Sequence, residues 1–213
     1  MPRTTATHRH TTLRLVVWAQ AVILAFVFLD LLVSDSADWL LREGGSIETV
    51  SAVLLAMAAV AHARLHDLRR DWHVPVGLLL LSLRELDADK AFTTEGILQS
   101  NLYTDPAPWP EKVIGGAVVL LAFVVLYRLA RYQLVPWLRG LWAGDGWAWT
   151  FTLAGVLVVV AKSLDGIARK LAPLGIDVPN DLARFSGRVE ESFELIFALC
   201  LIAVVGLSRP RET

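Results

Sequence analysis

Acidic and basic side chains lie close together in the chain at the ends of several long apolar stretches. A charged side chain inside a membrane-length apolar helix costs roughly 2.5–3.5 kcal/mol on insertion scales, so it requires a partner or serves a function. Carboxylates hold cations or carry protons, whereas Arg and Lys hold anions such as phosphate. The candidate site consists of Glu48, Arg84, Glu85, Asp87, Lys90, Lys162, Asp165, Arg169, Glu191 and Glu194.

The spacing of these residues predicts that they lie at one depth. Lys162, Asp165 and Arg169 are spaced i, i+3 and i+7, which places them on one face of a continuous helix. At 1.5 Å per residue, Arg84 lies about 18 Å along its helix from Trp72. Lys162 lies about 21 Å along its own helix from Ala148. We therefore expect a polar cup that opens to one side of a membrane.

Three functions from different classes fit such a cup. The leading expectation is that it binds an ion or a small anionic or lipid-borne group, coupled to transport, with Arg84 and Lys162 holding an anion. The second is a metal-assisted lipid head-group enzyme that uses Mg²⁺ or Mn²⁺, with Glu48, Glu191 and Glu194 as the metal ligands. The third is a structural membrane subunit whose charges form interhelical ion pairs. Whether the protein is an enzyme stays open.

Long apolar stretches must position these side chains. The 213-residue chain is 55% hydrophobic with a mean hydropathy of +0.52, which is too apolar for a water-soluble domain. A bilayer core of ~30 Å requires about 20 mostly apolar residues per helix. We predict an all-α fold in which residues 1–213 form a single integral membrane domain, a polytopic bundle of six transmembrane helices. The predicted spans are 15–33, 46–63, 73–90, 113–134, 148–169 and 190–207.

The charges are sorted by side of the membrane. With six spans, one side carries 11 cations and 4 carboxylates, and the other carries 9 cations and 17 carboxylates. Cytoplasmic loops are enriched in Lys and Arg, so the first side is expected to be cytoplasmic, with both termini inside and the cup facing the periplasm. The expected partners are the lipid bilayer and an ion or lipid head group. The net charge of −1 gives no reason to expect nucleic acid, and the oligomeric state stays open.

Other chemistry lacks the residues that it needs. Cys200 is the single cysteine, which excludes an intrachain disulfide and a cysteine-based metal cluster. The chain contains neither a nucleophile elbow nor a phosphate-binding glycine loop. His62 and His66 are four residues apart and are expected at a solvated helix end. In the connection 92–112, residues 94–102 are expected to form either a short helix over the cup or an interfacial linker.

Three short motifs lie at the ends of predicted helices. Residues 42–48 read REGGSIE, residues 83–87 read LRELD, and residues 190–195 read EESFEL. In these motifs the chain resembles small uncharacterised multi-pass inner-membrane proteins of bacteria. The resemblance implies an inner-membrane location and about six helices, and it brings no activity with it.

Overall fold

The computed structural model describes residues 46–104 and 106–208. The predicted span at 15–33 lies outside these residues. The described part contains nine α-helices and one 3₁₀ helix, so the expectation of an all-α fold is confirmed. The long helices are α2 (Ser46–Leu65), α4 (His73–Glu85), α7 (Trp109–Ala143), α8 (Gly146–Leu164) and α10 (Asn180–Leu207). The short ones are α3 (Leu68–Asp71), α5 (Ala88–Phe92), α6 (Asn101–Thr104), α9 (Ile167–Leu171) and η1 (Ala172–Leu174).

Three helices in the described ranges are long and apolar enough to cross a membrane. They are Ile47–Leu65 within α2, Trp109–Ala143 (α7) and Gly146–Leu164 (α8). They overlap the spans predicted at 46–63, 113–134 and 148–169. Helices of this length and composition indicate a lipid bilayer environment.

The prediction of six spans is wrong. At 73–90, α4 has 13 residues, which gives about 20 Å of helix, short of a ~30 Å bilayer core. The chain leaves the helix after Glu85, and Asp87 adopts a left-handed conformation with φ of 47°. At 190–207, α10 is long enough, but three glutamates fall within the predicted span and leave only 195–207 uncharged.

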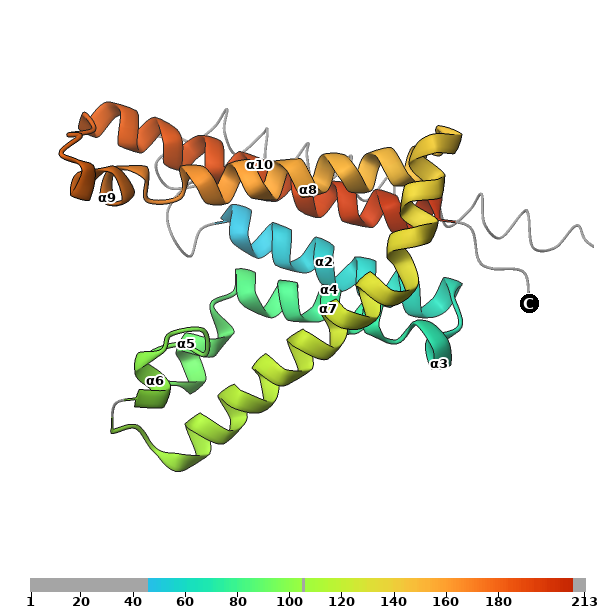
Figure 1. The fold of residues 1–213 in the computed structure, drawn as a ribbon, viewed down its shortest axis with the longest axis horizontal. Helices are drawn as coiled ribbons and strands as arrows, with labels where there is room; N and C mark the ends of the chain where they lie inside the picture. Colours follow the sequence, from blue (N-terminus) through green and yellow to red (C-terminus); the bar gives the residue numbers. More distant parts are fainter. Residues whose placement is uncertain (1–45, 105, 209–213) are drawn as a thin grey trace, which may run out of the picture.

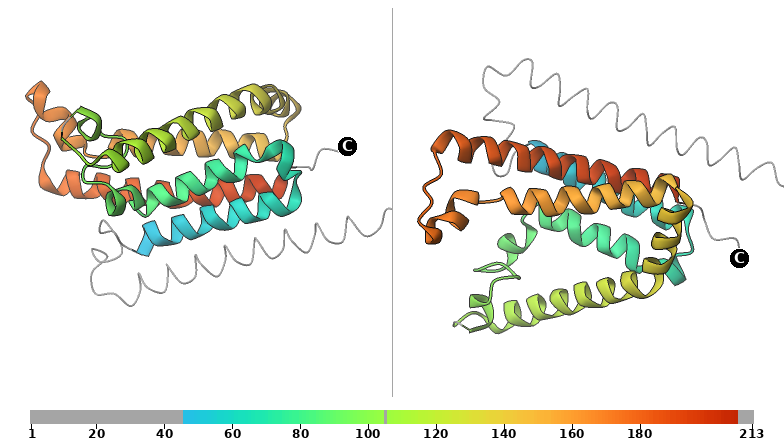
Figure 2. Two further views of the ribbon diagram at one scale, coloured as in Figure 1. Left: turned by 90° about the horizontal axis from the view of Figure 1, so that it is seen from below. Right: turned by 45° about the horizontal axis from the view of Figure 1, so that its top comes forward.

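The helix α2 lies between α10 and α4 in Figure 1, and the left view of Figure 2 shows it at one edge of the coloured helices. It packs against α4 on one side and α10 on the other, α8 packs along α10, and α7 contacts α4 and α8. Small side chains such as Ala58, Ala154 and Ala198 allow the helix backbones to approach closely. Around them, Leu54, Leu55, Leu78, Leu195, Leu201 and Ile202 form a buried apolar layer. We call these six leucine and isoleucine side chains the apolar layer.

The direction of each helix decides which residues meet. α2 and α10 run one way, and α4 and α8 run the other way (Figure 1). The starts of α2 and α10 therefore lie at the same end of the bundle as the ends of α4 and α8, and we call this the acidic end. The opposite end, which contains α3, is called the basic end. α7 bends in its last third, where Pro136 lies inside the helix (Figure 1).

The connection between α5 and α7 is attached to the first turn of α7. The backbone N–H of Thr94 donates to Glu111 Oε2 at 2.8 Å, and the Tyr103 hydroxyl donates to the Ile97 carbonyl at 2.9 Å. Leu102 is fully buried. Of the two expectations for 94–102, a short helix or a linker, the structure has a linker up to Ser100 and a short helix at Asn101–Thr104.

Candidate functional site

Charged side chains from four helices gather at the acidic end. Glu191 on α10 interacts electrostatically with carboxylates on α2 and α4 as well as with its own neighbours. Glu85 on α4 interacts with α2, α8 and α10 in the same way. We call this set the acidic cluster. Its members are Glu48, Arg84, Glu85, Lys162, Glu190, Glu191 and Glu194.

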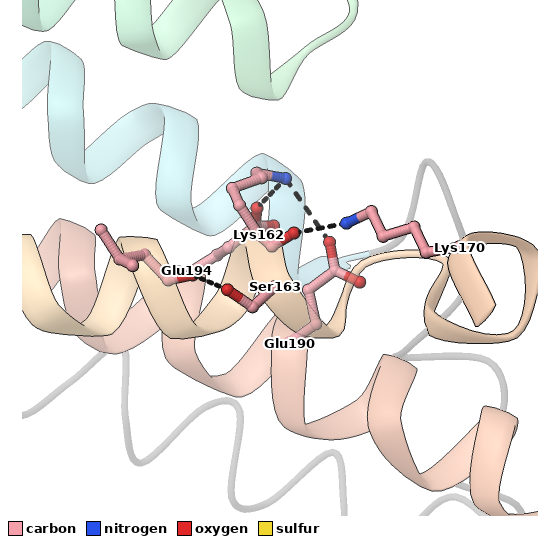
Figure 3. Close-up of polar contacts among 6 residues, drawn as sticks. Lys162, Ser163, Lys170, Glu190 and Glu194 are labelled. Carbon is pink, nitrogen blue, oxygen red and sulfur yellow. Dashed lines mark hydrogen bonds and ion pairs between the residues drawn. The ribbon is translucent and has the colours of Figure 1, made fainter. Parts of the chain in front are cut away.

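Lys162 makes the closest contacts within the acidic cluster. Its Nζ lies 2.6 Å from Glu194 Oε1 and 3.4 Å from Glu190 Oε1, so one ammonium group joins α8 to two carboxylates of α10 (Figure 3). The Lys162 side chain is 36% exposed, whereas those of Glu190 and Glu194 are 17% and 13% exposed. In this partly buried position the ion pair is less screened than a surface pair.

The turn after α8 is held in place by a second lysine. Lys170 Nζ on α9 donates to the backbone carbonyl of Lys162 at 2.6 Å (Figure 3). This carbonyl belongs to the last turn of α8, where carbonyl groups have no partner within the helix. The bond therefore fixes the end of the helix that carries Lys162.

The structure separates some of the predicted site residues from one another. The α8 helix ends at Leu164, and Gly166 adopts a left-handed φ of 57°, so the single helical face expected for Lys162, Asp165 and Arg169 is wrong. Asp165 follows the end of α8 and interacts electrostatically with Glu190, whereas Arg169 belongs to α9.

Asp87 and Lys90 form an ion pair with each other. Lys90 Nζ lies 2.6 Å from Asp87 Oδ2, and both side chains are about 60% exposed. This pair has the same length as the Lys162–Glu194 pair but a very different exposure. It therefore provides a solvated counterpart within the same protein.

Glu190 was missed as a member of the candidate site. It stands i, i+4 from Glu194, a spacing that places both carboxylates on one helical face, and this was the available signal. Its contact with Lys162 depends on how α8 and α10 pack, which the spacing along one helix does not specify.

Carboxylates outnumber cations in the acidic cluster. It contains five glutamates and two basic residues, so the difference is three negative charges when all are ionised. Among the residues that the structure describes, no group of three or more His, Cys, Asp or Glu side chains is already arranged as a metal site while Lys162 occupies its position. The cluster therefore offers negative charge distributed over several helices.

Two serines lie one helical turn from the acidic cluster, toward the basic end of the bundle. Ser82, three residues before Glu85, donates its Oγ hydrogen to the Ala52 carbonyl at 2.8 Å. Ser51, three residues after Glu48, is 1% exposed, and its Oγ has no hydrogen-bond partner among the described residues. Beyond these hydroxyl groups the apolar layer begins.

Comparisons with known protein families, with curated proteins and with solved structures find no match. The chain is therefore characterised by its own geometry, as an all-α protein with three candidate membrane spans in its described part.

His62 and His66 lie at the basic end and are not solvated as the sequence suggested. The rings of His62 and His66 stack at 4.2 Å, and His62 is 6% exposed. His66 Nε2 lies 3.3 Å from Ser208 Oγ at the end of α10. Burial lowers the pKa of His66, although the backbone hydrogen bond with His62 and the charge of Asp71 both act to raise it. His66 therefore connects the end of α2 to the end of α10.

Proposed function

We propose that the acidic cluster binds a small monovalent cation and that this binding is a step in transport. The observation that carries the proposal is the excess of carboxylates around Lys162 at the meeting point of four helices. A cation lowers the repulsion between neighbouring carboxylates, whereas an anion adds to it. The charge balance therefore favours a cation over an anionic ligand.

Lys162 gives this site a means of exchange. Its ammonium group already occupies a position between Glu190 and Glu194, where a mobile cation would make the same contacts. A bound cation and the Lys162 ammonium then compete for the two carboxylates. Competition of this kind keeps binding reversible, as transport requires.

The proposed orientation places the basic end in the cytoplasm of a bacterial cell and the acidic end in the periplasm, with the protein in the inner membrane. Six arginines on α2, α3 and α7 support it, because cytoplasmic segments near membrane spans are enriched in Arg and Lys. They are Arg64, Arg69, Arg70, Arg128, Arg131 and Arg139.

A topology experiment tests this orientation. Reporter domains inserted after Asp105 and fused after Thr213 are expected to report the periplasm and the cytoplasm, respectively. Activity of an alkaline phosphatase reporter and fluorescence of a green fluorescent reporter measure the two positions. The reverse pattern would contradict the proposed direction of the acidic end.

Cation binding is tested by stability in lipid nanodiscs. A ligand that binds only the folded state stabilises it by RT ln(1 + [L]/Kd), about 2.7 kcal/mol at a hundredfold excess over Kd. The thermal midpoint should therefore rise with Na⁺, K⁺ or proton concentration at constant ionic strength, which choline chloride maintains. Glu191→Gln should remove most of this rise.

Glu95→Gln is the matched control, because Glu95 is an exposed carboxylate at the acidic end outside the acidic cluster. It should leave the cation dependence unchanged. A response to Na⁺ or K⁺ identifies a metal cation as the ligand, and a response to pH alone identifies the proton. If Glu191→Gln and Glu95→Gln respond alike to every cation, the proposed binding site is wrong. Flux of the identified cation into sealed vesicles then tests transport, and equal flux with and without protein contradicts it.

A further inference from the structure

The basic end contains a second charged surface, built where α3 meets α7. Arg128 on α7 donates from Nη2 to the backbone carbonyl of Arg70 at 2.9 Å and from Nε to His73 Nδ1 at 3.4 Å. These bonds bring the arginines of α7 next to those of α3. We call Arg69, Arg70, Arg128 and Arg131 the basic corner.

Aromatic rings hold the basic corner in a defined geometry. The Arg128 guanidinium lies over the ring of Trp72 at 5.2 Å and over that of Tyr132 at 4.9 Å, and Arg131 lies over Tyr132 at 5.8 Å. Stacking occupies the faces of a guanidinium and leaves its N–H groups at the edge available for hydrogen bonds. Arg128 and Arg131 are therefore held in place before any ligand arrives.

The length of α7 fits a basic corner at the level of the lipid head groups. Along α7, the rise from Trp109 to Arg128 is about 28 Å and to Arg131 about 33 Å. A hydrocarbon core of ~30 Å that begins near Trp109 thus ends between these two arginines. Leu68, next to Arg69, is 50% exposed and lies at the same corner.

The arginines of the basic corner lack acidic partners within the described ranges. None of their guanidinium groups forms an ion pair with a described carboxylate. Asp67 and Asp71 are the nearest acidic residues along the chain, and neither forms an ion pair with these arginines. Asp67 accepts a hydrogen bond from the backbone N–H of Arg69, and Asp71 is buried. The corner therefore presents positive charge to the membrane surface.

We propose that the basic corner binds the phosphate of an anionic phospholipid head group. Guanidinium groups recognise phosphate oxygens through paired hydrogen bonds, and basic pockets beside membrane helices bind anionic head groups. Arg69, Arg70 and Arg131 contact the phosphate, while Arg128 positions α3 against α7. The exposed side chain of Leu68 lies beside the acyl chains. This site is separate from the acidic cluster and independent of the proposed cation binding.

The experiment measures retention of phosphatidylglycerol by native mass spectrometry, with phosphatidylcholine as the neutral reference. In Arg69→Gln/Arg70→Gln, affinity for phosphatidylglycerol should fall about tenfold more than in the control, and phosphatidylcholine should be unaffected. Because Arg128 bonds the backbone carbonyl of Arg70, this variant retains the connection between α3 and α7. The control is Arg64→Gln/Arg139→Gln, which removes the same charge from exposed positions outside the corner.

Two results would overturn the proposal. Equal losses in both double variants would mean that the basic end attracts anionic lipid only through its overall charge. Displacement of phosphatidylglycerol by millimolar inorganic phosphate would mean that the corner recognises free phosphate and not a lipid. Circular dichroism of each variant checks that the helices are intact, and Arg131→Gln alone should reproduce part of the loss.

Discussion

Replacing Lys162 with methionine is expected to lower the free energy of unfolding by about 2–3 kcal/mol. Removing one partner of a fully buried ion pair costs roughly 3–5 kcal/mol, because the other charge is left without compensation. Lys162 is 36% exposed, so solvent screens part of this effect. Titration with a denaturing detergent in mixed micelles measures the change.

Two comparisons make this result specific. Lys90→Met removes a pair of the same length whose side chains are about 60% exposed, and it should change stability by less than about 1 kcal/mol. Lys162→Met combined with Glu194→Gln should regain most of the lost stability, because it removes both charges of the 2.6 Å pair. If Lys162→Met is as mild as Lys90→Met, solvent and not Lys162 compensates the glutamates of α10.

Leu54→Ala is expected to lower the free energy of unfolding by about 2–5 kcal/mol. Leu54 is fully buried in the apolar layer, and a cavity there removes packing contacts among α2 and its neighbours. Its neighbour Val53 is 49% exposed on the outer face of α2. Val53→Ala should have little effect, because lipid chains fill the space as well as the lost methyl groups did. Equal effects would contradict the placement of Leu54 in the apolar layer.

The apolar pattern of the sequence predicted the membrane helices that are long and uninterrupted. It failed at α4, because hydropathy measures composition and does not detect the left-handed residue Asp87 that ends the helical region. The same cause applies at Gly166, which ends the helical segment before Arg169 is reached. A break of the helix at one residue does not noticeably change a hydropathy averaged over about 20 residues.

The acidic cluster was partly predictable for a different reason. Charged residues are rare in apolar helices, so Glu48, Arg84, Lys162 and Glu194 stood out from their surroundings. Their common position along the bundle followed from helix length. Because α2 and α10 run in the opposite direction to α4 and α8, the starts of α2 and α10 lie beside the ends of α4 and α8. The contact between Lys162 and Glu190 was not predictable, because it depends on the rotation of α8 about its axis relative to α10.

The thickness of the apolar layer has an electrical consequence. Polar side chains extend from the acidic end to Ser51 and Ser82, and they resume at His62, which is 11 residues beyond Ser51 on α2. This separation corresponds to about 16 Å of helix, roughly half of a ~30 Å hydrocarbon core. A membrane voltage falls mainly across the part that excludes water and mobile charge, at about 2.3 kcal/mol per elementary charge for each 100 mV. A charge that crossed the bundle would therefore have to pass the buried side chains of Leu54 and Leu55, which lie in this apolar separation.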